Sequence, residues 1–139
     1  MIFCYFVGPF KEKRFEQLVV DYQKRLSRLW PVTVSEVSED FKSIQKIMDS
    51  KKNKGDLVSL DAHGKSMDSQ AFASWVTAFP RDIHFFAWGA ERPTKGLVGL
   101  PSKSLSLSPM TYSHELARVL LMEQLYRAGA LLRGHPYPK

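Results

Sequence analysis

The sequence predicts an α/β domain with a mainly parallel sheet and helices on both of its faces. Short apolar runs, typical of buried strands, alternate with longer segments whose apolar residues recur at helical spacing. Hydrophobic residues make up 44% of the chain and charged residues 24%, the balance of a globular protein. Because 139 residues leave room for one core of ordinary size, we expect a single domain over residues 1–139.

The first half of the chain predicts two strands, each followed by a helix. The apolar run over residues 2–7 predicts a buried strand, and the apolar periodicity over about residues 11–29 predicts an amphipathic helix. Residues 32–34 predict a second strand. A second helix is marked by the apolar residues from Phe41 to Met48, with Asp40 as a candidate cap.

The second half continues the alternation. Residues 57–61 predict a third strand, and Asp68 is a candidate cap for a third helix that carries aromatic and valine side chains. The almost wholly apolar residues 83–88 predict a fourth strand. Residues 104–108 predict a fifth strand or a strand-like loop, and a last helix is expected from about 112 to 132.

This order of elements predicts where a ligand binds. In parallel sheets covered by helices, ligands bind beyond the carboxyl ends of the strands. The loops that follow Asp61, Trp88 and Leu107 belong to that edge of the sheet. We therefore expect the binding site where these three loops meet.

The last helix is apolar on all sides, which predicts a homodimer. A helix with one buried stripe has no need of this pattern, so one side is expected to pack on the sheet and the other on a second chain. A charge at Met122 or Leu125, whichever faces the partner, should then release monomers. The alternative is a central helix within one domain. The residues concerned are Leu116, Val119, Leu120, Leu121, Met122, Leu125, Tyr126, Leu131 and Leu132.

The basic charge is concentrated in the last third of the chain. The net charge is +6; residues 1–91 carry 13 basic and 12 acidic side chains, and residues 92–139 carry seven and two. A basic pole favours a polyanionic partner such as RNA, although charge also serves solubility. We expect Arg127, Arg133 and Lys139 to contact the RNA.

Several familiar classes of site are excluded. The chain has no Walker sequence and no GxGxxG, and its four histidines lack metal-ligand spacing, so we expect no metal site. No apolar run reaches the roughly 18–20 residues of a membrane span. A single cysteine and the absence of a signal peptide favour a cytoplasmic protein.

The candidate catalytic side chains lie in a cluster near the start of the last helix. Thr111 is a candidate cap, His114 lies in the first turn, and Arg118 follows one turn later on the same face. The helix N-terminus favours a neutral imidazole, which can accept a proton. The alternative is a structural histidine that ties the loop to the helix. Further along, Glu123 and Arg127 have the spacing of an ion pair.

The stretch from Leu105 to Ala128, LSLSPMTYSHELARVLLMEQLYRA, resembles the RlmH family of SPOUT-class methyltransferases. The family's pattern is close to S-L-S-x-M-T-x-x-H-x-x-x-R-x-L-L-x-E-Q-L-Y-R-A. Leu60-Asp61 with Gly64-Lys65 is similar to its L-D-x-x-G-K. The resemblance implies a C-terminal trefoil knot, an obligate homodimer and S-adenosylmethionine as the methyl donor. It also implies methylation of N3 of a pseudouridine in 23S ribosomal RNA within the assembled ribosome.

The resemblance assigns roles to individual residues. It implies that Tyr137, in the tail, helps to build the active site. His114, Arg118 and His135 are, in that order, our candidates for accepting the proton of the target base or stabilising its anion. The cofactor pocket would be formed by Leu60, Trp88, Gly89, Leu107, Ser108, Pro109, Met110, Thr111 and Tyr112.

Three positions depart from the family's pattern. Trp88 and Arg92 stand where the family has the first and third glycines of I-G-G-x-x-G, and Pro138 replaces the tail histidine. We expect the Trp88 indole to turn into the core, which leaves its backbone and Gly89 facing the ligand. The departures also suggest an alternative, a non-catalytic RNA- or ribosome-binding relative. The strand–helix order alone would further fit a small-molecule enzyme.

Overall fold

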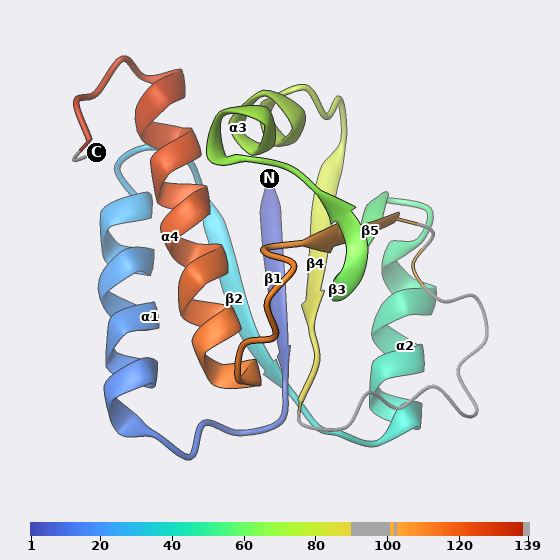
Figure 1. Ribbon diagram of the computed structural model, residues 1–139. Coiled ribbons are helices and arrows are strands. Elements are labelled where there is room, and N and C mark those ends of the chain that lie inside the picture. The colour runs from blue at the N-terminus through green and yellow to red at the C-terminus, as the bar shows by residue number, and fades with distance from the viewer. Residues whose placement is uncertain (90–100, 102, 138–139) are drawn as a thin grey trace.

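Five parallel strands form one sheet in the computed structural model, in the order β2-β1-β4-β3-β5 (Figure 1). The structure describes residues 1–89, 101 and 103–137. The mainly parallel α/β fold predicted from the sequence is confirmed. The elements are β1 (Ile2–Val7), α1 (Lys13–Leu26), β2 (Val32–Val37), α2 (Phe41–Lys51), β3 (Gly55–Ser66), α3 (Ser69–Thr77), β4 (Asp82–Ala87), β5 (Lys103–Ser106) and α4 (His114–Leu132).

Side-chain caps fix where the helices begin. Asp40 and Asp68 each accept a hydrogen bond from the backbone N–H three residues later, at 2.8 and 2.7 Å, as predicted. The prediction that Thr111 caps the last helix is wrong. Ser113 is the cap of α4, because its hydroxyl accepts from the N–H of Leu116.

Helices cover both faces of the sheet. On one face, α1, α3 and α4 pack over a core that includes Phe6, Phe85 and Leu105. On the other face, Ile44 and Met48 of α2 close a smaller core of Tyr5, Val7, Val37, Phe86 and Trp88. The predicted arrangement of helices on both faces is therefore confirmed.

The last helix is a central helix of its own chain. Helix α4 packs between α1 and α3 (Figure 1), and Met122 and Leu125 are fully buried in the core. The prediction that a charge at one of these two residues would release monomers is wrong, because neither faces outward. Leu116 and Leu120 are partly exposed and Leu131 is exposed, so these leucines form the outward stripe of α4.

Strand β3 is longer than its apolar pattern predicts, because it pairs twice with β5. Val58 to Leu60 pair with Lys103 to Leu105, and after an irregularity Lys65 and Ser66 pair with Leu105 and Ser106. A Cβ atom at Gly64 would lie 2.9 Å from the backbone N of Leu105. Glycine thus allows β3 to fold closely over β5, and the bend brings residues 60–62 to the carboxyl edge of the sheet.

Among the described residues, no helix combines the length and hydropathy needed to cross a bilayer. Within the same residues, no cluster of three or more His, Cys, Asp or Glu side chains could hold a metal ion.

Candidate functional site

A cavity of about 300 Å³ lies beyond the carboxyl ends of β3, β4 and β5. Its volume is at the lower end of the range for small-molecule sites. The three loops singled out in the sequence all contribute to it. Its walls are formed by Leu60, Asp61, Ala62, Ala87, Trp88, Gly89, Leu105, Leu107, Ser108, Met110, Thr111, Tyr112, His114 and Ala117.

The structure brings together eight of the nine residues assigned to the cofactor pocket. Pro109 is exposed and is the one that does not line the cavity. Sequence reasoning missed small or apolar wall residues such as Ala62, Leu105 and Ala117, which carry no chemistry of their own. Helical spacing offered one signal, since Ala117 lies one turn from His114.

Two serines shape the loop between β5 and α4. The Ser106 hydroxyl donates to the carbonyl of Ser108 at 2.9 Å, and the N–H of Met110 donates to Ser108 Oγ at 3.0 Å. These bonds satisfy polar groups within the loop, as short side-chain-to-backbone bonds do in turns. The S-L-S-x-M pattern therefore sets the backbone conformation of one cavity wall.

Gly89 sits where other groups approach very closely. A Cβ atom there would lie 2.6 Å from Oε1 of Glu39 and 3.0 Å from the carbonyl oxygen of Val7. The same Glu39 carboxylate lies against Gly8, whose φ of +93° also favours glycine. Gly89 thus has a steric reason to be glycine: the ends of β1 and β4 and the Glu39 side chain meet beside the cavity.

The Trp88 indole occupies the core beneath α2, as expected from the sequence. Its Nε1 donates to Ser59 Oγ at 2.6 Å, and its ring stacks on Phe86 with centroids 5.8 Å apart. Only 7% of the residue is exposed. The large side chain is therefore accommodated outside the cavity, which Trp88 and Gly89 still line.

His114 and Arg118 have different surroundings. His114, the first residue of α4, lines the cavity. Arg118 is fully buried and is not among the described residues that line it. Its Nη2 donates to the carbonyl of Val7 at 2.7 Å, and its guanidinium lies 4.7 Å from the ring centroid of Phe10. Burial lowers the pKa of Arg118, yet a guanidinium keeps its proton in proteins.

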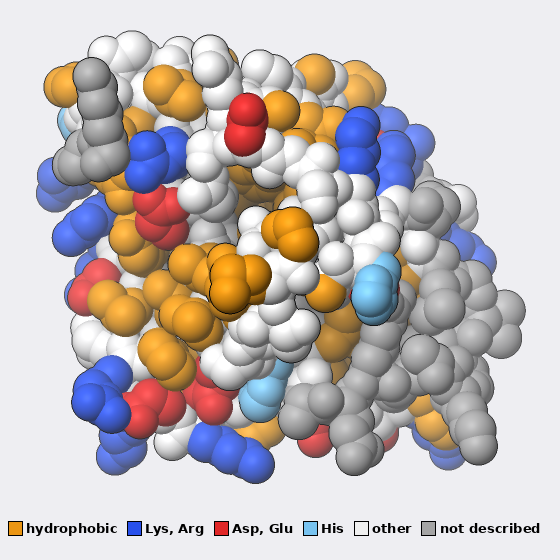
Figure 2. Space-filling view, viewed as in Figure 1, with side chains coloured by type: hydrophobic (Ala, Val, Ile, Leu, Met, Phe, Trp, Pro, Cys, Tyr) orange, Lys and Arg blue, Asp and Glu red, His pale blue; other side chains and the backbone are white. Residues whose placement is uncertain are grey.

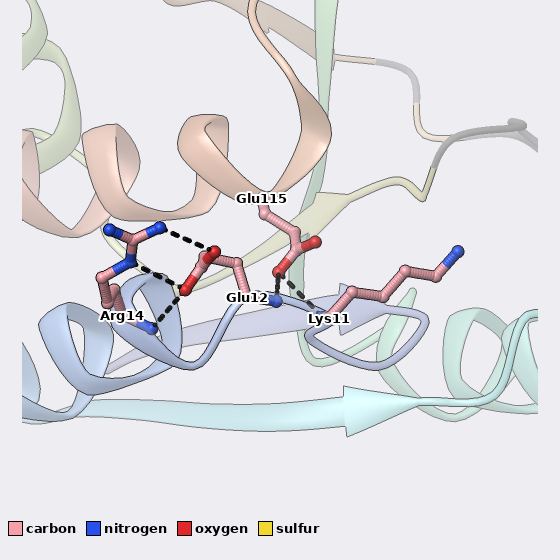
Figure 3. A network of polar contacts seen from close by, with 4 residues as sticks. All are labelled: Lys11, Glu12, Arg14 and Glu115. Carbon is pink, nitrogen blue, oxygen red and sulfur yellow. Dashed lines mark hydrogen bonds and ion pairs between the residues drawn. The ribbon is translucent and has the colours of Figure 1, made fainter.

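Glu115 ties the start of α4 to the start of α1. Its Oε1 accepts hydrogen bonds from the N–H groups of Lys11 and Glu12, at 3.0 and 3.1 Å (Figure 3). Glu12 in turn caps α1 through the N–H of Arg14. The Glu115 bonds therefore anchor the start of α4, and so His114, to the start of α1. The Arg118 bond anchors the same part of α4 to the end of β1.

The predicted tail residues lie at the other end of α4. Tyr137 donates to Glu123 Oε1 at 3.2 Å and packs edge-on against Tyr126. Burial, followed by its hydrogen bond with Tyr22, raises the pKa of Tyr137. These contacts place Tyr137 beside the second half of α4, and neither Tyr137 nor His135 is among the described residues that line the cavity.

The predicted RNA-contacting residues also lie at that end. Arg127 forms the expected ion pair with Glu123, at 2.9 Å, and its guanidinium covers the ring of Tyr137. Arg133 is exposed and its Nε donates to the carbonyl of Leu29. The predictions for Arg92, Pro138 and Lys139 fall outside the described residues.

Residues 1–138 match the sequence profile of a family described as "Predicted SPOUT methyltransferase". A protein named "Ribosomal RNA large subunit methyltransferase H" from Coprothermobacter proteolyticus is 34% identical over 139 residues, covering 96% of this chain and 95% of the relative. Its namesake from Prochlorococcus marinus is 36% identical over 134 residues, with 96% and 92% covered. A third, from Gemmatimonas aurantiaca, is 32% identical with 96% of both chains covered. Each similarity spans nearly the whole chain.

Proposed function

The chain belongs to the SPOUT methyltransferase family, and from that premise we propose that it methylates N3 of a pseudouridine in 23S ribosomal RNA. Its relatives over nearly full length carry the name of a large-subunit ribosomal RNA methyltransferase. The observation that carries the proposal is that the three strand-end loops line one cavity together. A cytoplasmic location, where ribosomes work, fits this role.

The cavity suits S-adenosylmethionine, which supplies an electrophilic methyl group on a sulfonium sulfur when bound. Leu60, Leu105 and Leu107 offer apolar walls for an adenine ring. Backbone groups at the ends of β3 and β4 can read its polar edge. We assign Leu60, Trp88, Gly89 and residues 107–112 to cofactor binding on this basis.

His114 is the residue that we assign to proton transfer. Methylation of N3 replaces its hydrogen by a methyl group, so the imide proton must pass to an acceptor. His114 lies in the cavity at the start of α4, where an imidazole nitrogen can accept this proton. Arg118 acts as a positioning residue, because it holds Val7 beside Gly89. The protein would also lower the activation barrier by holding the methyl group of the cofactor in line with N3 of the base.

We further infer a homodimer in which the tail of a second protomer completes the cavity. His135 and Tyr137 do not line the cavity of their own chain, and Tyr137 packs against the second half of α4. Figure 2 shows hydrophobic side chains gathered over α1 and α4, and Leu18 and Leu131 are 42% and 55% exposed. An apolar surface of this kind is typical of an interface.

A trefoil knot belongs to the same proposal. Strand β3 pairs with β5 on both sides of an irregularity and crosses closely over it at Gly64. The chain then runs from β5 into α4, which packs back between α1 and α3. This crossing supports the threaded arrangement that the family resemblance implies.

Methyl transfer to ribosomes tests the proposed function. Ribosomes that lack the modification would be incubated with the protein and S-adenosylmethionine, and the RNA digested and analysed by mass spectrometry. We expect N3-methylpseudouridine in the 23S RNA with the wild type and a large loss of kcat with His114→Ala. Cofactor binding without any methyl transfer would contradict the enzyme and favour the non-catalytic relative.

A further inference from the structure

A basic groove of about 380 Å³ lies at the end of α4 opposite the cofactor cavity. One wall comes from the end of α1 and the turn after it, with Lys24, Arg25 and Arg28. Tyr126 of α4 and His135 of the tail form the other wall, and Leu29 lies between them. We refer to these six residues as the basic groove.

The cations of the basic groove are available to an outside anion. Lys24, Arg25 and Arg28 are exposed, and none of them forms an ion pair within the part of the chain that the structure describes. No carboxylate is among the groove residues. The helix dipole would account for Lys24 and Arg25 in the last turn of α1, but not for Arg28 or His135 beyond the ends of their helices.

The walls of the basic groove are fixed before any ligand binds. Arg133 Nε donates to the carbonyl of Leu29 at 2.9 Å, and Trp30 Nε1 donates to the carbonyl of Leu125 at 3.2 Å. Gly129 permits this packing, since a Cβ atom there would lie 2.9 Å from Trp30 Nε1. These contacts join two segments about 100 residues apart in sequence. A preformed site loses less conformational entropy on binding.

We propose that the basic groove binds the phosphodiester backbone of the RNA substrate, an inference that rests on the proposed function. Clustered Lys and Arg side chains neutralise phosphates, and Tyr126 adds an aromatic surface suited to a sugar or base. A second copy of the chain is a poorer occupant, because an isologous contact would oppose like charges. Because the proposed dimer places the tail at the cavity of the second protomer, and His135 of that tail forms one wall of the groove, the groove would hold RNA beside that protomer's methylation site.

Salt-dependent RNA binding tests the proposal. The variant Lys24→Gln/Arg25→Gln/Arg28→Gln is compared with Lys42→Gln/Lys46→Gln/Lys54→Gln, which removes the same charge from exposed positions on and after α2. The probe is a short fluorescein-labelled RNA, with affinity measured by anisotropy at several salt concentrations. Each lost phosphate contact lowers the slope of log K against log salt by about 0.7, so the groove variant should lose roughly 2. The α2 variant should keep the wild-type slope.

Equal slopes of log K against log salt for the two variants would contradict RNA binding by the basic groove. So would polyglutamate that displaces the labelled RNA as effectively as unlabelled RNA does. Methyl transfer separates this result from the proposed function. We expect the groove variant to raise the KM for ribosomes while kcat at saturating ribosomes and calorimetric binding of S-adenosylmethionine stay unchanged. An unchanged KM would reject the groove and leave the enzyme standing. Groove-dependent RNA binding without methyl transfer by the wild type would support the groove and reject the enzyme.

Discussion

The indole of Trp88 stabilises the fold, so the role proposed for Trp88 toward the cofactor falls to its backbone. Its buried indole packs beneath α2 and donates a hydrogen bond to Ser59 Oγ. We expect Trp88→Gly to lower the free energy of unfolding by about 3–5 kcal/mol, as large core truncations do. Affinity for S-adenosylmethionine should stay within about tenfold, or roughly 1.4 kcal/mol. Urea unfolding and calorimetry measure the two effects.

The opposite pattern would show that Trp88 obstructs the cavity. In that case the wild type would fail to bind the cofactor and Trp88→Gly would bind it. Trp88→Phe serves as the control, because it keeps an aromatic ring in the core while it removes the bond to Ser59.

Glu115 gives a second test at the scale of one residue. Its carboxylate accepts two backbone N–H groups at the start of α1 and is only 8% exposed. Glu115→Ala leaves both donors without that acceptor, and we expect a loss of about 1–3 kcal/mol for each. Glu115→Gln retains an acceptor oxygen and should lose less. Equal urea midpoints for both variants and the wild type would contradict this anchoring role.

His84 predicts a pH dependence of stability. It is buried beside Tyr5, whose hydroxyl lies 3.0 Å from its Nδ1, and burial lowers the pKa of His84 to about 4. In the unfolded chain the pKa of histidine is about 6.5, so below that pH the unfolded state takes up a proton first. The free energy of unfolding should therefore fall by up to about 1.4 kcal/mol per pH unit as the pH is lowered from roughly 6.5 to about 4.

Replacement of the histidine isolates this contribution. His84→Phe keeps a ring beside Phe3 and removes the titrating group. Urea unfolding across the same pH range should give a shallower slope for the variant. Identical slopes would show that other groups cause the pH dependence.

At the scale of elements, the outer surface of α1 and α4 predicts the oligomeric state. Leu18 shares a stripe of α1 with Tyr22, which contacts Tyr126 of α4. We expect the wild type to sediment at twice its chain mass of 15.9 kDa and Leu18→Glu to sediment as a monomer. Phe41→Glu is the matched control, because Phe41 is 46% exposed on α2, on the other face of the sheet. A monomeric wild type would contradict the dimer.

Local patterns predicted most of the elements, because apolar periodicity and capping side chains act over a few residues. Asp40 and Asp68 begin their helices as predicted, since their acceptors serve N–H groups three residues away. Strand β3 was predicted too short because its last pairs, at Lys65 and Ser66, depend on β5, some 40 residues later. The need for glycine at position 64 likewise depends on a distant backbone.

At the scale of the whole molecule, topology alone predicted that the three loops meet around one cavity. Carboxyl ends of parallel strands share an edge, so the loops after β3, β4 and β5 had to lie near one another. The surroundings of Arg118 and Tyr137 were beyond prediction, because helical spacing gives a face but not the neighbour of that face. Only the packing of α4 shows that Arg118 meets β1 and that the tail lies at the far end.

Calorimetric titration with S-adenosylmethionine tests the central claim, that the cavity at the carboxyl ends of β3, β4 and β5 holds the methyl donor. Ala117 lines this cavity from α4, whereas Ala71 is exposed on α3. We expect binding by the wild type and by Ala71→Leu, and a loss of more than about tenfold in affinity, or 1.4 kcal/mol, for Ala117→Leu. Equal affinities for the two variants, or no binding by the wild type, would contradict it.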